Sequence, residues 1–266
     1  MELQTMIEPV AELAKMAGDA ILEVYATDFD VQAKDDDSPL TQADMASHRV
    51  INAGLLELTP ELPIISEESG LPAFAERSAW STYWLIDPLD GTREFVNRNG
   101  EFTVNIALIR DNAPVFGVVY VPVSGVTYIG CEGVGAELRN GNDSSTIKVS
   151  QYSANPVRVV GSRSHRGSSL DAFLEQISDY EMLPMGSSLK FCKVAEGAAD
   201  IYPRLGPTSE WDTAAAQAVV EQAGGKVVQL DGKPLSYNEK EEILNPFFLV
   251  IGADDQDWLA MVDSAS

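Results

Sequence analysis

Acidic residues fall into three short clusters that could together hold a divalent metal ion. Glu67 and Glu68 form the first cluster, Asp87 and Asp90 the second, and Asp212 belongs to a third far downstream. Carboxylate oxygens are the ligands that Mg²⁺ prefers, and this ion usually meets a protein through a few carboxylates plus substrate phosphate. The three clusters therefore favour a phosphate-ester hydrolase in which a cation activates water.

The middle cluster has the most informative spacing. It reads Asp87-Pro88-Leu89-Asp90-Gly91-Thr92 and directly follows the apolar run 83–86, which places both aspartates at the end of a strand. An EF-hand loop would need an oxygen ligand at Leu89 and a glutamate at Arg98, so that motif is excluded. Phosphatases that form an aspartyl-phosphate have a single residue between their two aspartates, which argues against a covalent mechanism here. A plain strand followed by an Asp-Gly turn remains the alternative.

The composition is that of a globular chain with a strong negative charge. The 266 residues are 45% hydrophobic, which is enough to bury a substantial core. The formal net charge of -23 argues against a DNA or RNA partner, because binding a polyanion depends on Lys and Arg that neutralise its phosphates. A small anionic substrate remains compatible, because bound divalent cations invert the local field.

Other common kinds of site find little support. Two cysteines, Cys131 and Cys192, are too few for a disulfide framework. Two histidines, His48 and His165, leave no imidazole-rich zinc site and disfavour a Ser-His-Asp triad. The sequence predicts neither a signal peptide nor a membrane span. We therefore expect a cytoplasmic protein, with peripheral association with the inner membrane left open.

The elements that must position these residues are helices followed by a sheet. Apolar residues at three- and four-residue spacing predict a helix over residues 3–24, and a second helix from Thr41 to the stop signal at Thr59 and Pro60. Runs of β-branched and aromatic residues predict the principal sheet, with strands at 83–86, 102–108, 115–121 and 127–130. The polar segment 140–145 is expected to be an exposed loop.

A second pattern begins near Val157. It predicts strands at 157–161, 226–228 and 247–251, and helices at 169–176, 189–195 and 213–222. Mixed strands and helices favour an α/β (α+β) fold built from layers of both. We divide the chain into an N-terminal half, residues 1–155, with the main metal motifs, and a C-terminal half, residues 156–266, with the last aspartate.

Each candidate residue also has a plain structural alternative. Glu67 could belong to a solvated loop. Asp44 could be part of a capping-box-like helix start with Thr41 as the cap. Asp212 could be the N-cap of the helix 213–222, although the free N–H groups at that helix start would also favour a nearby phosphate.

Three motifs carry a resemblance to a known family. Glu-Glu-Ser at 67–69, Asp-Pro-Leu-Asp-Gly-Thr at 87–92 and Trp-Asp-Thr-Ala-Ala at 211–215, in this order, resemble the lithium-sensitive, Mg²⁺-dependent phosphatases related to inositol monophosphatase. Segments 99–105, 162–165, 186–192 and 202–204 look like the bacterial 3'(2'),5'-bisphosphate nucleotidase branch, so the resemblance covers nearly the whole chain. It implies the layered αβαβα fold of the sugar phosphatases.

The resemblance also implies a metal site and a catalytic pair. Two Mg²⁺ ions are expected, and a third near Glu67 is left open. Asp87 would bridge the two ions. The other metal ligands implied by the family are Glu67, the Leu89 carbonyl, Asp90 and Asp212. Asp44 and Thr92 would orient and deprotonate the attacking water, with Glu67 as a further catalytic residue.

Substrate binding is implied mainly for the second half. By resemblance, four residues would surround the uncleaved phosphate of a nucleotide: His165, Ser187, Lys190 and Arg204. Donors and cations suit that task. Four residues of the metal motifs would also contact the substrate: Asp90, Gly91, Thr92 and Asp212.

The implied reaction removes the 3'-phosphate of adenosine 3',5'-bisphosphate (PAP), yielding AMP and phosphate. By the same resemblance it extends to the sulfated relative PAPS, yielding APS, and would clear a by-product of sulfur metabolism. Two alternatives remain: an inositol or sugar monophosphate phosphatase of the same superfamily, and a non-catalytic cation-binding protein. The sequence leaves open the oligomeric state, the preference between PAP and PAPS, and the degree of lithium inhibition.

Overall fold

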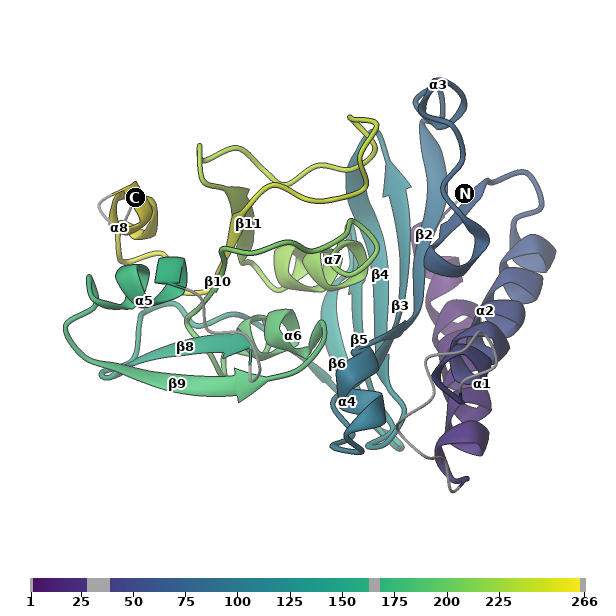
Figure 1. The fold of residues 1–266 in the computed structure, drawn as a ribbon, viewed down its shortest axis with the longest axis horizontal. Coiled ribbons are helices and arrows are strands. Elements are labelled where there is room, and N and C mark those ends of the chain that lie inside the picture. The colour runs from purple at the N-terminus through teal and green to yellow at the C-terminus, as the bar shows by residue number, and fades with distance from the viewer. Residues whose placement is uncertain (1, 28–38, 163–167, 264–266) are drawn as a thin grey trace.

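Helices and sheets alternate in the αβαβα order that was predicted (Figure 1). The computed structural model describes residues 2–27, 39–162 and 168–263. A pair of helices packs on the first sheet, a second pair lies between the two sheets, and a third pair covers the second sheet. In that order the helices are α1 (Ile7–Tyr25) and α2 (Pro39–Leu58), α6 (Leu189–Ala195) and α7 (Ala214–Gln222), and α5 (Ser168–Leu174) and α8 (Trp258–Asp263).

The first sheet contains the principal strands predicted from the sequence. β1 pairs with β2 in parallel, and each later strand pairs antiparallel with the one before it. The strands are β1 (Ile64–Ser66), β2 (Thr82–Asp90), β3 (Thr103–Arg110), β4 (Ala113–Val121), β5 (Val126–Cys131), β6 (Gly135–Asn140) and β7 (Asp143–Thr146).

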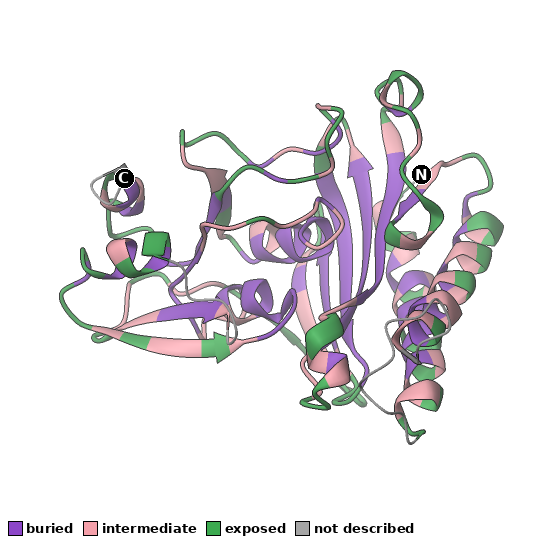
Figure 2. Cartoon of the chain, in the orientation of Figure 1, coloured by how far each residue is buried: buried purple, intermediate pink, exposed green. Residues whose placement is uncertain are grey.

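Both faces of this sheet are buried at its centre (Figure 2). Side chains alternate along a strand, so Trp84 and Ile86 of β2 face the α1–α2 layer, whereas Tyr83 and Leu85 face the α6–α7 layer. A strand with helices on both faces needs a continuous apolar run, which is the pattern that β2 shows. Burial on both sides makes β2 a rigid support for the aspartates at its end.

Helix α7 lies unusually close to the first sheet because glycine stands opposite alanine. A Cβ at Gly117 of β4 would lie 2.2 Å from the carbonyl oxygen of Ala215, and one at Gly130 of β5 would lie 2.5 Å from the backbone of Ala218. Such distances are far inside van der Waals contact, so only glycine fits at either position. This close packing fixes the start of α7, and with it the segment that carries Asp212.

The second sheet has the order β11-β12-β10-β8-β9. β8 pairs in parallel with β9 and β10, while β12 pairs antiparallel with β10 and β11. Its strands are β8 (Val157–Ser162), β9 (Tyr180–Met185), β10 (Ile201–Arg204), β11 (Lys226–Gln229) and β12 (Phe248–Ile251). The division of the chain at residues 155 and 156 stays a prediction.

Two local predictions were wrong. Segment 140–145 is no loop, because β6 and β7 form a hairpin whose turn lies at Gly141 and Asn142; Gly141 adopts a φ of 59°, which suits a tight hairpin turn. Helix α2 begins at Pro39, so Thr41 lies inside the helix and is not its cap. The remaining short helices are η1 (Leu3–Met6), η2 (Glu67–Ser69), α3 (Phe74–Arg77) and α4 (Thr92–Val96).

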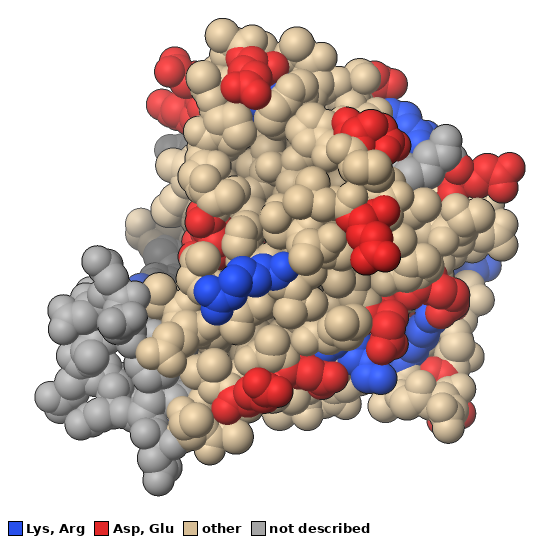
Figure 3. Space-filling view, turned by 90° about the vertical axis from the view of Figure 1, so that its right-hand side faces the viewer, with Lys and Arg blue, Asp and Glu red and all other residues tan. Residues whose placement is uncertain are grey.

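The negative charge is visible on the outer face of the α1–α2 layer. Figure 3 shows acidic side chains spread over this face, with basic ones interspersed. Exposed acids of α1 include Glu8, Glu12, Asp19 and Glu23. Within the described residues, none of the helices has both the length and the apolar character needed to cross a membrane.

Candidate metal and substrate site

The parallel pairing of β1 with β2 brings the first two acidic clusters together. Ser66 lies opposite Ile86 in the register, and the two strands end at the same edge of the sheet. The residues that follow, Glu67 and Asp87, therefore emerge side by side. Helix α2 is fastened to both strand ends, because Ser47 donates to the Pro88 carbonyl at 2.8 Å and His48 Nδ1 lies 2.9 Å from Ser66 Oγ.

An irregularity in β2 directs both aspartates to this edge. Asp87 lies opposite Asn105 and Asp90 opposite Thr103, so β2 has one more residue than β3 across this stretch. Pro88 has no N–H to give to the ladder, which suits a bulge. The Leu89 N–H donates to Asp87 Oδ1 at 3.0 Å and holds the carboxylate within the turn.

Asp212 reaches the cluster from the loop before α7. Its Oδ2 accepts hydrogen bonds from the Thr208 hydroxyl at 2.7 Å and from the Ser209 N–H at 2.9 Å. Thr213 is the N-cap residue of α7, so the interpretation of Asp212 as a helix cap was wrong. The two bonds orient the carboxylate toward Glu67 and Asp87.

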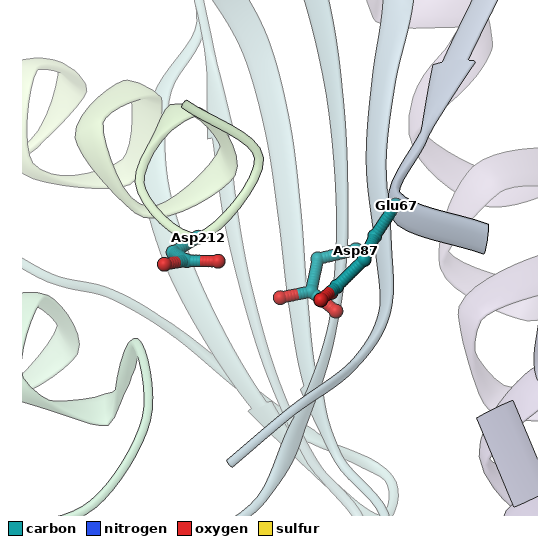
Figure 4. A group of neighbouring side chains, drawn as sticks. All are labelled: Glu67, Asp87 and Asp212. Atoms are coloured by element: carbon teal, nitrogen blue, oxygen red, sulfur yellow. The ribbon is translucent and has the colours of Figure 1, made fainter. Parts of the chain in front are cut away.

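Three carboxylates form a compact group. One oxygen from each of Glu67, Asp87 and Asp212 lies within 4.8 Å of the others, and Figure 4 shows Glu67 and Asp87 pointing toward one another with Asp212 facing them. Glu67 keeps an exposed surface, but the partial desolvation of its carboxylate, together with the charges of Asp212, Glu68 and Asp90, raises its pKa to about 7. Burial and the same cluster of charges raise the pKa of Asp87 well above its usual value.

The residues present fit a divalent cation. Like charges held this close repel one another, and hard oxygen donors that converge on one point suit Mg²⁺ or a similar ion. The identity and number of the ions remain predictions, as do the individual ligand roles of Glu67, Asp87, Leu89, Asp90 and Asp212.

Asp44 lies beside the cluster on α2. Burial, together with the charges of Glu68 and Glu67, raises its pKa to about 8. Its Oδ1 is buried and has no hydrogen-bond partner among the described residues. Helix α2 packs against η2, which carries Glu67, and against α4, which begins at Thr92. An acceptor in this position could take a proton from a water in the site.

Asp90 links the cluster to the second half of the chain. Its Oδ2 accepts from the Ser188 N–H at 2.5 Å, with Thr103 and Asn105 at 3.5 Å. Burial and the Asp212 charge raise the pKa of Asp90 to about 7, while Lys190 and the hydrogen bonds oppose the rise. Sequence reasoning gave Ser188 no role, because its importance comes from a contact with a residue 98 positions away.

A cavity of about 280 Å³ lies between Asp90 and Asp212 of the acidic motifs and residues of the second sheet. Its lining includes predicted site residues from both halves of the chain: Asp90, Gly91, Thr92, Ser187, Lys190, Arg204 and Asp212. It also includes Phe191 and Tyr202, to which sequence reasoning gave no role. The predicted site residue His165 lies outside the described residues.

The far end of the cavity is cationic. Lys190 is buried, and burial lowers its pKa to about 8 against the opposing influence of Asp90. Its ammonium group donates to the Ser187 carbonyl at 2.5 Å, and Ser187 adopts the left-handed φ of 44° that few residues other than glycine accept. Arg204 Nε is buried without a hydrogen-bond partner among the described residues. Two cations held together under these conditions favour an anionic ligand.

The fold and this site define a phosphatase of the inositol monophosphatase class. The sequence profile described as the inositol monophosphatase family matches residues 2–258. The chain belongs to this family, whose members are metal-dependent.

Two relatives within the family are about half identical to this chain. The chain is 50% identical over 247 residues to the 3'(2'),5'-bisphosphate nucleotidase CysQ of Salmonella typhimurium, and 49% identical to that of Escherichia coli K12. Each match covers 92% of this chain and 99% of the relative. The crystal structure of CysQ from Bacteroides thetaiotaomicron superposes with a TM-score of 0.84 at 39% identity, covering 93% of this chain and 97% of that one.

Proposed function

We propose that this protein is a Mg²⁺-dependent nucleotidase that hydrolyses the 3'-phosphate of PAP to give AMP and phosphate, and that it also converts PAPS to APS. The proposal is supported by the resemblance found in the sequence and by relatives named 3'(2'),5'-bisphosphate nucleotidase that are 49–50% identical over nearly their whole length. The cytoplasmic location stays a prediction.

One observation carries the proposal. A single cavity is lined at one end by Asp90 and Asp212 of the acidic motifs and at the other by the buried Lys190 and by Arg204. A substrate with one phosphate needs only the first of these ends. A nucleotide with two phosphates supplies an anion for each, so the cavity favours a bisphosphate over an inositol monophosphate.

The residues around the acidic end divide the chemical work. Asp87, Glu67 and Asp212 would hold Mg²⁺, with Asp90 beside them, and the ion would lower the pKa of a water and neutralise charge on the phosphoryl oxygens. Asp44 takes the proton of the attacking water, with the Thr92 hydroxyl as a relay that accepts from water and donates to the carboxylate. The raised pKa of Asp44 suits a base that works near neutral pH.

The residues at the cationic end determine which phosphate is cleaved. Lys190 and Arg204 would bind the phosphate that stays on the product, and Ser187 holds the lysine in place through its carbonyl oxygen. Anchoring one phosphate fixes the orientation of the other against the acidic cluster. Such positioning is a large part of catalysis for phosphoryl transfer.

The test compares phosphate release from PAP and from inositol 1-phosphate, each with Mg²⁺ and with a chelator. We expect Mg²⁺-dependent release with a strong preference for PAP. A preference for inositol phosphate would keep the metal site and overturn the substrate. No release from either compound would support the alternative of a non-catalytic cation-binding protein.

A further inference from the structure

We infer that Arg77 is a positioning residue for the metal site, and that it joins the segment carrying Glu67 to the loop carrying Asp212. The inference rests on the proposed function in one respect, namely that the carboxylate cluster binds Mg²⁺. Arg77 itself lines no part of the cavity and contacts none of the three carboxylates.

Arg77 is buried, and its guanidinium group donates hydrogen bonds to four acceptors. It ends α3, the short helix that follows η2 and the cluster residue Glu67. Its Nε donates to the Pro72 carbonyl at 3.2 Å, and Nη2 donates to the carbonyls of Lys240 at 3.0 Å and Glu241 at 2.5 Å. Nη1 donates to Asn238 Oδ1. These donors fasten the segment 72–77 to a loop more than 160 residues downstream.

The loop that contains Asn238 and Lys240 also binds Glu210, which lies two positions before Asp212. The Asn238 N–H donates to Glu210 Oε2 at 2.9 Å, and Lys240 Nζ donates to Glu210 Oε1 at 2.9 Å. Glu210 is buried, and its own N–H donates to the Ile243 carbonyl at 2.9 Å. Asn238 completes the connection by donating its side-chain amide to the Arg77 carbonyl at 2.7 Å. Arg77 is thus connected to Glu210 through Asn238 by hydrogen bonds and through Lys240 by a hydrogen bond and an ion pair.

The connection opposes a force that the site creates. Glu67 and Asp212 come from separate segments of the chain, and their negative charges repel each other. Glu67 follows β1 and Asp212 precedes α7, so regular structure restrains each segment from one side and leaves a restraint on the other side to be supplied. Arg77 provides that restraint from outside the cavity, and a cation then meets ligands that are already assembled. Groups that hydrogen-bond directly to metal ligands typically contribute about 10- to 100-fold in metal affinity or activity, and Arg77 acts one contact further out, so the lower end of that range is expected.

The experiment measures Mg²⁺ affinity without catalysis, as the Mg²⁺ concentration at half saturation (the Mg²⁺ midpoint) in a calorimetric titration of the metal-free protein, with the unfolding temperature of each variant measured separately in chelator. R77M should raise this midpoint about tenfold relative to the wild type. R77K should raise it as well, because a lysine keeps the charge but cannot reach four acceptors. A wild-type midpoint in either variant would overturn the inference, and recovery in R77K alone would show that charge, not position, matters.

A matched control separates positioning from general stability. Arg158 also sits in a dense network, with bonds to Asp200 at 2.5 Å, the Gly197 carbonyl at 2.8 Å and Ser150 Oγ at 3.2 Å, but it lies in the second sheet away from both segments. R158M should lower the unfolding temperature while leaving the Mg²⁺ midpoint unchanged. An equal rise of the midpoint in R158M would mean that any arginine with several hydrogen bonds has this effect, and the inference would fail.

A second variant covers the case in which R77M does not fold. Asn238 has a left-handed φ of 59°, so N238G keeps the backbone conformation and removes both side-chain contacts to Arg77. It should raise the Mg²⁺ midpoint in the same direction, and an unchanged midpoint would count against the inference. No substrate enters this assay, so the two proposals can fail separately. If the proposed function were wrong, Mg²⁺ binding and its dependence on Arg77 would remain while phosphate release from PAP would be absent.

Discussion

Replacing Asp87 with asparagine should stabilise the metal-free protein and remove its stabilisation by Mg²⁺. Asp87 is only 1% exposed and lies among carboxylates whose negative charges oppose its own. Asparagine has nearly the same shape, and its oxygen can still accept the Leu89 N–H that now donates at 3.0 Å. The substitution therefore removes a buried charge and leaves the local backbone supported.

The size of the effect follows from the spacing of the cluster. The ligand oxygens lie within 4.8 Å of one another, and two unit charges at that separation repel by roughly 3 kcal/mol at an effective dielectric constant of about 20. Asp87 avoids part of this cost by protonation, since its pKa is raised, so a gain of about 1–2 kcal/mol remains. For a chain of this size, that corresponds to a rise of about 2–8 °C in unfolding temperature.

Thermal unfolding in chelator and in excess Mg²⁺ provides the assay. At a Mg²⁺ concentration about 100 times its Kd, the wild type should gain about 2.7 kcal/mol, and D87N should gain little. D200N is the matched control, because Asp200 is equally buried but is paired with Arg158 at 2.5 Å. That variant should lose stability and keep its Mg²⁺ response. A D87N protein that is less stable than the wild type in chelator, or that responds fully to Mg²⁺, would refute the reasoning.

The remaining predictions concern the base, the cationic end and pH. D44N should lower kcat about 10²- to 10⁴-fold while the thermal shift with Mg²⁺ is retained, and loss of that shift would identify Asp44 as a metal ligand instead. K190M should raise the KM for PAP about 10- to 100-fold and change the KM for inositol 1-phosphate far less; equal losses would contradict its role. In chelator, the unfolding temperature should fall as pH rises from about 5 to about 8.5. The reason is that Glu67 and Asp44 have pKa values in the folded protein (about 7 and about 8) that lie above those in the unfolded chain. The folded protein therefore keeps its full stability below the unfolded-state pKa values, and loses part of it as pH rises through the folded-state values. Excess Mg²⁺, which binds the deprotonated carboxylates, should remove this fall, and a pH-independent metal-free protein would contradict the raised pKa values.

The metal motif of β2 could be predicted because its information is local. An apolar run followed by Asp-Pro-Leu-Asp-Gly predicts a strand end and a turn, and β2 does end at Asp90 with Gly91 in a left-handed φ of 96°. The short strand β1 could not be predicted in the same way, since three residues are too few to show a period. Yet its parallel register is what brings Glu67 beside Asp87.

Most features of the site that could not be predicted from the sequence depend on contacts between distant segments. Asp212 precedes a helix, which locally favours a cap, but its carboxylate is fixed by Thr208 and Ser209 instead. Arg77 stands in a short helix with no motif, and its role depends on acceptors more than 160 residues away. Polar residues of this kind have partners that propensity and spacing do not specify.

Asp90 couples the two ends of the cavity, so metal binding and substrate binding cannot be fully separated. The Lys190 charge lowers the pKa of Asp90, and Asp90 raises the pKa of Lys190 in return. A phosphate bound at Lys190 would partly neutralise that cation and so raise the proton affinity of Asp90, which costs free energy when the carboxylate must stay ionised. Mg²⁺ bound at the cluster would hold the carboxylate ionised and remove this cost, and the substrate phosphates would in turn supply ligands to the ion. Binding of the ion and of a bisphosphate should therefore be mutually favourable, because each offsets the charge that the other leaves uncompensated.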